Sequence, residues 1–259
     1  MRHLKLTIAY NGTDYVGWQV QPNGIAVQQR LEEAWTAATQ EQIRIVASGR
    51  TDAGVHALGQ VCSVATETEL DCSTLVRALN AHSPRDIVVV EVNEAPTGFH
   101  AIRDASRKTY RYKIQHGMIP NPLVTNDHWF CRHKLDIAAM KLAAKILIGE
   151  HDFASFQATG AERSSTVRYL SQLTCHESNN GSFDYLQLDL TCNGFLYNMV
   201  RNIVGTLVRV GQGREEPDWV SAVLQAKDRS VAGPTAPAHG LVLLNVEYDG
   251  IKFRSEPIG

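Results

Sequence analysis

A glycine-rich stretch with a central aspartate runs from Ser48 to Val61 and reads Ser-Gly-Arg-Thr-Asp-Ala-Gly-Val-His-Ala-Leu-Gly-Gln-Val. Apolar and polar residues alternate at 42–47 and again at 61–65, which predicts a strand on each side of it. The glycines in the stretch allow a tight loop whose backbone can approach a ligand closely. The sequence therefore predicts a glycine-rich loop between two strands.

Asp52 lies at the centre of this loop, between Arg50 and His56. A free aspartate has a pKa of about 3.9, so its carboxyl group should be ionised at neutral pH unless its surroundings prevent it. Two interpretations are open from the residues alone. Asp52 either bonds backbone N–H groups of the turn, as many loop aspartates do, or acts on a substrate whose phosphate Arg50 holds. In the second case we expect Arg50 and His56 to bind the substrate.

Composition places the chain among soluble globular proteins. Of its 259 residues, 44% are hydrophobic and 20% are charged, and this length is enough to bury the core of one large or two small domains. The five cysteines are odd in number and include no Cys-x-x-Cys pair, which disfavours a disulfide framework or a zinc knuckle. No apolar run approaches the roughly 20 residues that span a membrane. The N-terminal residues alternate like a strand rather than a signal peptide. We therefore expect a cytoplasmic protein with no membrane contact.

The first half of the chain has the pattern of a split βαβ unit. Strands are expected near 4–10, 42–47, 61–65 and 87–92, and helices near 26–39 and from about Ser73. The second half repeats the theme with strands near 108–114, 128–132, 167–176, 184–192 and 241–248, and helices near 137–147, 196–210 and after Pro217. Asp136 is the expected N-cap of the first of these helices, and 151–158 is expected to be a loop.

The predicted fold is α+β, with two ferredoxin-like (split βαβ) halves at 1–102 and 103–259. Each half is expected to have an antiparallel or mixed sheet covered by helices on one face. The first half carries the Asp52 loop.

Net charge is −2, but residues 101–135 hold seven basic side chains against two acidic ones. Such a segment is either a solvated face or the electrostatic footprint of an RNA partner. Within it, Lys108, Tyr110 and Tyr112 lie on one face of the expected strand, because side chains alternate along a strand. An aromatic ring beside Arg107 and Lys108 suits base stacking with phosphate contact. We expect at least one of these tyrosines to pack in the sheet, and we assign that role to Tyr112.

Two further segments draw attention. The expected helix that follows Asn193 is apolar on most faces, so a charged Arg201 within it would be costly to bury unless it is paired. Asp52 is the candidate partner, and a purely structural ion pair is the alternative. The loop Thr235–Leu241, which contains His239, is expected to be structural.

No metal site is predicted. His128, Cys131 and His133 are close in sequence, but on a strand they do not converge in a ligand geometry.

The run Gly49–Ala57, with Gly-Gln-Val close behind it, resembles the signature of the tRNA pseudouridine synthase A family. The segment Asn193–Gly205 resembles the family's second motif, and Ala236–Leu241 resembles its closing motif. The resemblance covers nearly the whole chain. It implies the pseudouridine synthase fold, with Asp52 as the nucleophile, Tyr110 against the target base and Arg201 in contact with the nucleophile.

The resemblance also implies an activity. The protein would be an isomerase, a homodimer without a cofactor, that converts uridine to pseudouridine at positions 38 to 40 in the anticodon stem-loop of tRNA. The alternatives are a synthase for other tRNA or ribosomal uridines and a non-catalytic RNA-binding protein. A hydrolase with an aspartate nucleophile would be expected to show a second acidic motif, and none is evident.

Overall fold

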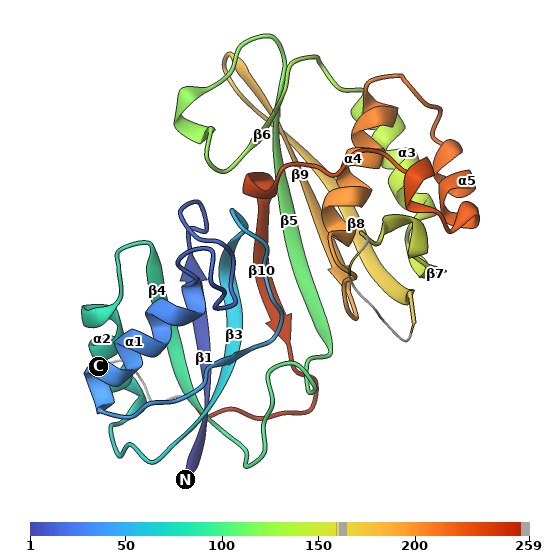
Figure 1. Cartoon of the computed structure of the whole chain (residues 1–259). Coiled ribbons are helices and arrows are strands. Elements are labelled where there is room, and N and C mark those ends of the chain that lie inside the picture. The colour runs from blue at the N-terminus through green and yellow to red at the C-terminus, as the bar shows by residue number, and fades with distance from the viewer. Residues whose placement is uncertain (159, 161–164, 255–259) are drawn as a thin grey trace. The chain divides into compact units, whose positions relative to one another are not determined.

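A computed structural model of the chain describes residues 1–158, 160 and 165–254, which form two compact units (Figure 1). The first unit comprises residues 1–106 and 243 onward, and the second comprises 107–242. The last strand thus returns mostly to the first unit, whereas the sequence analysis assigns it to the second half. These units are defined by contacts between residues. A domain is instead a part of the chain that folds as a unit, so the predicted division into domains after residue 102 stays a prediction.

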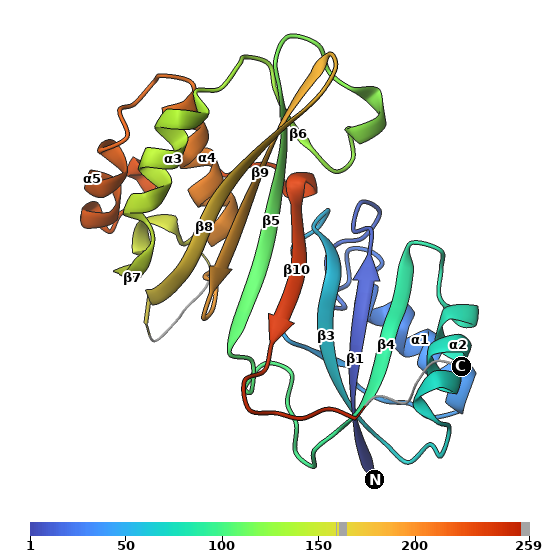
Figure 2. The ribbon, with the colours of Figure 1, turned by 180° about the vertical axis from the view of Figure 1, so that it is seen from behind.

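The first unit is a sheet with two helices on one face (Figures 1 and 2). Its strands lie in the order β4-β1-β3-β10, and β2 pairs with β3. Strand β1 runs antiparallel to both of its neighbours. The elements are β1 (Arg2–Tyr10), α1 (Val27–Thr39), β2 (Val46–Ala47), β3 (His56–Thr66), α2 (Cys72–His82), β4 (Ile87–Ala95) and β10 (Leu241–Glu247).

The second unit is a sheet in the order β5-β9-β8-β7, with β6 beside β5. Strand β9 is antiparallel to β5 and β8, while β6 runs parallel to β5 over three residues. Helices α3, α4 and α5 lie on one face of this sheet (Figure 2). The elements are β5 (Arg107–His116), β6 (Trp129–Cys131), α3 (Ile137–Ile146), β7 (Gly149–Asp152), β8 (Val167–Asn180), β9 (Phe183–Cys192), α4 (Met199–Gly211) and α5 (Trp219–Ala226).

Local sequence explains why α3 forms where it does. The Asp136 carboxylate accepts a hydrogen bond from the backbone N–H of Ala139 at 2.9 Å, which satisfies a donor that the first turn of a helix leaves unpaired. Met140, Ala143 and Ala144 are buried on one face of the helix. The predicted helix and its predicted cap are confirmed, as is the α+β class. The ferredoxin-like topology of each half stays a prediction.

Several element boundaries differ from those predicted. Strand β2 has only two residues, because only Val46 and Ala47 pair with β3. Strand β3 begins at His56, inside the expected loop. At Gly59 an added Cβ would lie 2.3 Å from the Leu244 carbonyl oxygen, so this glycine allows the close approach of β10 rather than a turn.

Two further differences concern the second unit. Helix α4 begins at Met199 rather than near 196, because Asn198 has a left-handed backbone with φ of 58° that interrupts the helix. Strand β7 and a 3-10 turn at Ala154–Phe156 occupy the segment that was expected to be a loop.

Candidate active site

The backbone of the Asp52 loop is held against the segment that follows β1. The N–H of Trp18 donates to the carbonyl of Thr51 at 3.0 Å, and the N–H of Val55 donates to the carbonyl of Asp52 at 3.1 Å. Gly17 forms a bridge with Asp52. The φ of Gly17 is +110°, and an added Cβ there would lie 2.6 Å from the Thr51 oxygen. The close approach that holds Asp52 in place therefore requires glycine at position 17.

Buried polar side chains fix the part of this loop that precedes Asp52. On one side the hydroxyl groups of Tyr10 and Thr51 are hydrogen-bonded at 2.8 Å. On the other side the Ser48 hydroxyl donates to Gln60 Oε1 at 2.8 Å, and Gln60 Nε2 donates to the Gly49 carbonyl at 2.9 Å. Gln60 is fully buried. Because a buried polar group is costly to leave unpaired, these bonds define one conformation of the loop.

The three side chains that the sequence singles out in this loop differ in exposure. Asp52 is partly exposed and Arg50 is exposed, so both are accessible to a ligand. His56 is only 8% exposed, and its Nδ1 accepts a hydrogen bond from the backbone N–H of Gly12 at 3.0 Å. This contact gives His56 a structural role in the loop, and its contact with a substrate stays a prediction.

The two tyrosines of β5 are both buried, in different ways. Tyr110 is 9% exposed, and its ring packs edge-on against Phe195, with centroids 5.1 Å apart and an interplanar angle of 89°. Tyr112 is fully buried, and its hydroxyl donates to the Pro237 carbonyl at 2.7 Å. Burial raises the pKa of the Tyr112 hydroxyl far above its ordinary value. The prediction that Tyr112 packs in the sheet is confirmed.

Part of the basic charge on β5 and near it is neutralised within the second unit. Arg111 binds Asp189 on the opposite strand through two hydrogen bonds of 2.7 Å, and Asp189 raises the pKa of Arg111. Lys113 pairs with Asp127 at 3.0 Å. The positive charge available to an RNA partner is therefore smaller than the count of basic residues in the sequence suggests. Arg107 stays exposed and Lys108 partly exposed on this strand.

Arg201 lies in the first turn of α4 and is held by the closing motif. Its Nε donates to the Ala236 carbonyl at 2.7 Å, and its own carbonyl accepts from the Ala236 N–H at 3.1 Å. Its Nη1 donates to Asn198 Oδ1 at 2.9 Å. The predicted structural role of the loop Thr235–Leu241 is confirmed, because this loop binds both Arg201 and Tyr112.

Sequence reasoning missed Asn202, the fully buried neighbour of Arg201. Its Oδ1 accepts from Arg229 Nη2 at 3.0 Å and from the Thr235 hydroxyl at 2.7 Å, and its Nδ2 donates to the Phe156 carbonyl at 2.8 Å. We call residues 229–236 the strap, since Asn202 ties this segment to α4. An asparagine inside an apolar helix is the signal that could have found it, because such a side chain needs buried partners.

Glycines bring the strap close to α4. An added Cβ at Gly205 would lie 1.7 Å from the Pro234 carbonyl oxygen, and one at Gly233 would lie 2.6 Å from the backbone of Thr206. The Gly233 N–H also donates to the Thr206 hydroxyl at 3.0 Å. Close packing of two backbones therefore places Ala236 where it can bind Arg201.

The predicted catalytic residues belong to both units. Asp52 lies in the first unit, whereas Tyr110 and Arg201 lie in the second. The pairing of Asp52 with Arg201 stays a prediction.

Two kinds of feature are absent from the described residues. No group of three or more His, Cys, Asp or Glu among them could hold a metal ion. His128 instead bonds Asp127 at 2.7 Å. Within the same part of the chain, no helix has the length and apolar character needed to cross a membrane.

A family model described as "tRNA pseudouridine synthase" matches residues 6–103 and 143–249. The chain belongs to the tRNA pseudouridine synthase family. It is therefore an isomerase of the pseudouridine synthase type. The matched ranges include Asp52 and Arg201 and leave out Tyr110, and the roles of all three residues stay predictions.

Individual relatives agree with the family model. Proteins named "tRNA pseudouridine synthase A" are 42% identical in Thermoanaerobacter sp. (strain X514) and 45% identical in Pelobacter propionicus, each over 96% of this chain and 100% of the relative. A protein of the same name in Roseiflexus sp. (strain RS-1) is 44% identical over 99% of this chain and 95% of its own. The family relationship thus extends over nearly the whole chain.

Proposed function

We propose that this protein isomerises uridine to pseudouridine in tRNA, at positions 38 to 40 of the anticodon stem-loop, with Asp52 as the nucleophile. The observation that carries the proposal is the Asp52 loop. A partly exposed carboxylate sits on a backbone that two hydrogen bonds and a glycine contact hold in one place, inside the motif that resembles the family signature. The names of the relatives supply the substrate class.

The reaction conserves atoms and electrons. The N1–C1′ glycosidic bond breaks, the uracil turns, and a bond forms between C5 and C1′. C5 loses a proton, and N1 gains one. A carboxylate nucleophile such as Asp52 divides this rearrangement into easier steps through a covalent adduct. Electrons are neither gained nor lost, so the stoichiometry requires no redox cofactor.

Other residues take supporting roles in this proposal. A base must leave its stack before a buried group can reach it, and Arg50 is accessible to hold a phosphate or fill the vacated space. Tyr110 would stack on the extruded uracil, and Arg107 and Lys108 on the same strand would contact phosphates. Arg201 would orient the Asp52 carboxylate and keep it ionised. The bonds of Arg201 to Ala236 and Asn198 support this role, because they fix the guanidinium on the second unit.

The proposal includes a homodimer that works in the cytoplasm. The runner-up functions are a synthase for other tRNA or ribosomal uridines and a non-catalytic RNA-binding protein. Mapping the modified positions in tRNA after treatment with the enzyme separates the first runner-up from the proposal. Modification confined to positions 38 to 40 supports the proposal, and modification elsewhere supports the alternative.

The test of catalysis is release of tritium from tRNA whose uridines carry tritium at C5. We expect release by the wild type and a loss of at least about 10³-fold for Asp52→Ala, because removal of a nucleophile removes the covalent route. Asp218→Asn is the control, since the Asp218 side chain is exposed and makes no cap hydrogen bond. Equal release by Asp52→Ala and the wild type would exclude Asp52 as the nucleophile, and binding of tRNA without any release would favour the RNA-binding alternative.

A further inference from the structure

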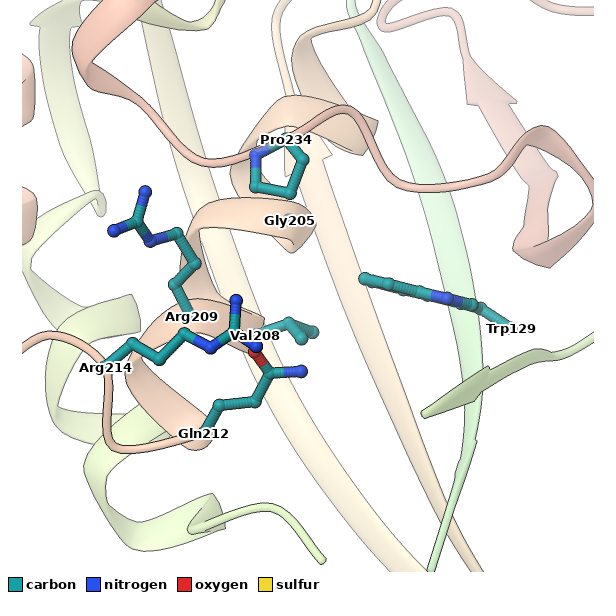
Figure 3. Close-up of a pocket in the computed structure, with 7 residues that line it drawn as sticks. All are labelled: Trp129, Gly205, Val208, Arg209, Gln212, Arg214 and Pro234. Carbon is teal, nitrogen blue, oxygen red and sulfur yellow. The ribbon is translucent and has the colours of Figure 1, made fainter. Parts of the chain in front are cut away.

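A cavity of about 410 Å³ lies beside α4 in the second unit (Figure 3). Sites for small ligands typically measure about 300 to 1,000 Å³, so one nucleotide unit can fit. The cavity is lined by none of the residues Asp52, Tyr110 and Arg201. It is therefore a feature that the proposed catalytic roles leave unexplained.

One side of the cavity is apolar and aromatic. Trp129 on β6, Val208 on α4 and Pro234 on the strap line it. The Trp129 ring stands edge-on to the buried Tyr112, with centroids 6.2 Å apart and an interplanar angle of 88°. Figure 3 shows the ring directed from β6 toward α4. A tryptophan held in this way offers a surface on which a nucleic acid base can stack.

The other side of the cavity carries hydrogen-bond donors at the end of α4. Arg214 is exposed, and its guanidinium makes no ion pair or hydrogen bond with any other described residue. The neighbouring Gln212 also lines the cavity. In Figure 3 both side chains extend toward the Trp129 side of α4. None of the described residues that line the cavity is acidic.

Arg209 also lines the cavity but is already engaged. It pairs with Glu215, and its guanidinium lies over the Trp219 ring at 5.1 Å from the centroid. Figure 3 shows its side chain extending away from Trp129. The uncompensated positive charge at the cavity therefore belongs to Arg214, with the exposed Glu216 nearby in sequence but outside the lining.

We propose that this cavity binds one nucleotide of the tRNA other than the uridine that is isomerised. Arg214 and Gln212 donate to its phosphate, and the base lies on the apolar side against Trp129. The planar guanidinium matches a phosphate geometrically, and a charge-assisted bond of this kind is among the stronger hydrogen bonds. The inference rests on the proposed function, because it takes an RNA substrate as given.

The first experiment uses Arg214→Gln in the full-length protein. The affinity for unlabelled tRNA is measured between 50 mM and 300 mM NaCl, and tritium release is measured in parallel. We expect the Kd and the KM to rise about fivefold, the slope of log Kd against log salt to fall by about one, and kcat to change less than about twofold. A lost phosphate contact weakens binding in this salt-dependent way, whereas a general loss of structure would lower kcat.

Lys145→Gln is the matched control. It also removes one positive charge from the second unit. Lys145 is exposed near the C-terminal end of α3, whereas Met140, nearer the other end of α3, packs against the end of α4. We expect its Kd and salt slope to match those of the wild type. Equal changes in Arg214→Gln and Lys145→Gln would overturn the proposal, because they would reflect charge in general.

A second pair of variants tests the stacking side. Trp129→Phe keeps an aromatic face, and Trp129→Leu removes it. We expect Trp129→Phe to keep the wild-type Kd within about twofold and Trp129→Leu to weaken binding about tenfold. Equal affinities of these two variants would overturn the base-binding role. A change in oligomeric state of Arg214→Gln, seen by sedimentation, would assign the cavity to contact between copies of the chain and would also overturn it.

Failure of this inference can be distinguished from failure of the proposed function. Tritium release by the wild type establishes the synthase activity whatever the Arg214 and Trp129 variants do. No release by the wild type from any tRNA would contradict the proposed function itself.

Discussion

Asn202 connects three segments of the second unit through its side chain. Its side chain amide binds the Phe156 carbonyl, the Thr235 hydroxyl and the Arg229 guanidinium, which come from three places in the sequence. Each net hydrogen bond contributes only about 1 kcal/mol, but a buried group left without its partner costs more than that. Asn202 therefore holds the strap beside Arg201, although its side-chain partners are not among the predicted substrate-binding residues.

Replacement of Asn202 by Ala should lower the free energy of unfolding by about 3 kcal/mol, because the Phe156 carbonyl and the strap donors lose their partner. Urea unfolding followed by circular dichroism measures the change. Asn179→Ala is the control, since Asn179 is exposed and its side chain donates to Asp184 Oδ1 at 2.6 Å, and it should change the free energy of unfolding by less than about 0.5 kcal/mol. A loss for Asn202→Ala no larger than for this control would show that the network is not stabilising.

Close packing against neighbouring segments limits which residues helix α4 can contain. Glycine lowers the stability of a helix interior by about 1 kcal/mol relative to alanine, so glycine at positions 205 and 211 of α4 needs a reason. At Gly205 the reason is the Pro234 carbonyl, a backbone atom that cannot move without the strap. At Gly211 the nearest atom is Met140 Sδ at 2.6 Å, which belongs to a flexible side chain.

The substitutions Gly205→Ala and Gly211→Ala should therefore have different effects. We expect Gly205→Ala to destabilise the protein by at least about 2 kcal/mol more than Gly211→Ala, because an added methyl group would displace the strap backbone. Thermal unfolding of both variants measures this difference. Gly205→Ala should also lower kcat for tritium release, since the strap carries the Ala236 carbonyl that binds Arg201. Equal melting temperatures would show that the strap moves away at little cost.

The chain begins in the first unit, forms the second unit and then returns to the first unit. The returning segment binds the first unit through the Tyr248 hydroxyl, which donates to the Ala101 carbonyl at 2.8 Å. The rings of Phe99, Tyr248 and Phe253 pack edge-on against one another, with centroids 5.1 to 5.8 Å apart. Residues far apart in sequence thus close the first unit, and stability measured on the full chain reports on both units.

The stability of the molecule should depend on pH through His116. This side chain is 5% exposed, and burial lowers its pKa below the ordinary value of 6.5. The folded protein thus favours neutral His116. The contribution of this neutral side chain to the free energy of unfolding is therefore fully present above pH 6.5. That contribution is lost as the pH falls below 6.5 toward the folded pKa, because the unfolded chain then binds the additional proton.

Urea unfolding between pH 7.5 and 5.5 tests this effect. The wild type should lose up to about 1.4 kcal/mol per pH unit below pH 6.5, and His116→Gln should lose less. His176→Gln replaces an exposed histidine on β8 and serves as the control, which should keep the wild-type dependence. If His116→Gln and the wild type show the same pH dependence, His116 does not couple to folding.

Local pattern was sufficient for much of this molecule. The spacing of apolar residues predicted α1 and α3, and a carboxylate before α3 predicted its cap, because these features depend on residues within a few positions of one another. The motif around Asp52 pointed to the family whose model matches the chain. The roles of Asp52, Tyr110 and Arg201 stay predictions, since a motif names residue types and not their contacts.

Neighbouring residues were thus sufficient to predict the family, the α+β class and the order of the helices and strands apart from β7. Contacts between groups that are far apart in the sequence became visible in the folded structure alone. Asp189 neutralises Arg111 across 78 positions of sequence, and Asn202 reaches Phe156 across 46. The cavity beside α4 joins Trp129 to Arg214 in the same way. Such contacts form because burying many groups together lowers the free energy of the folded chain. A local sequence pattern does not contain this information.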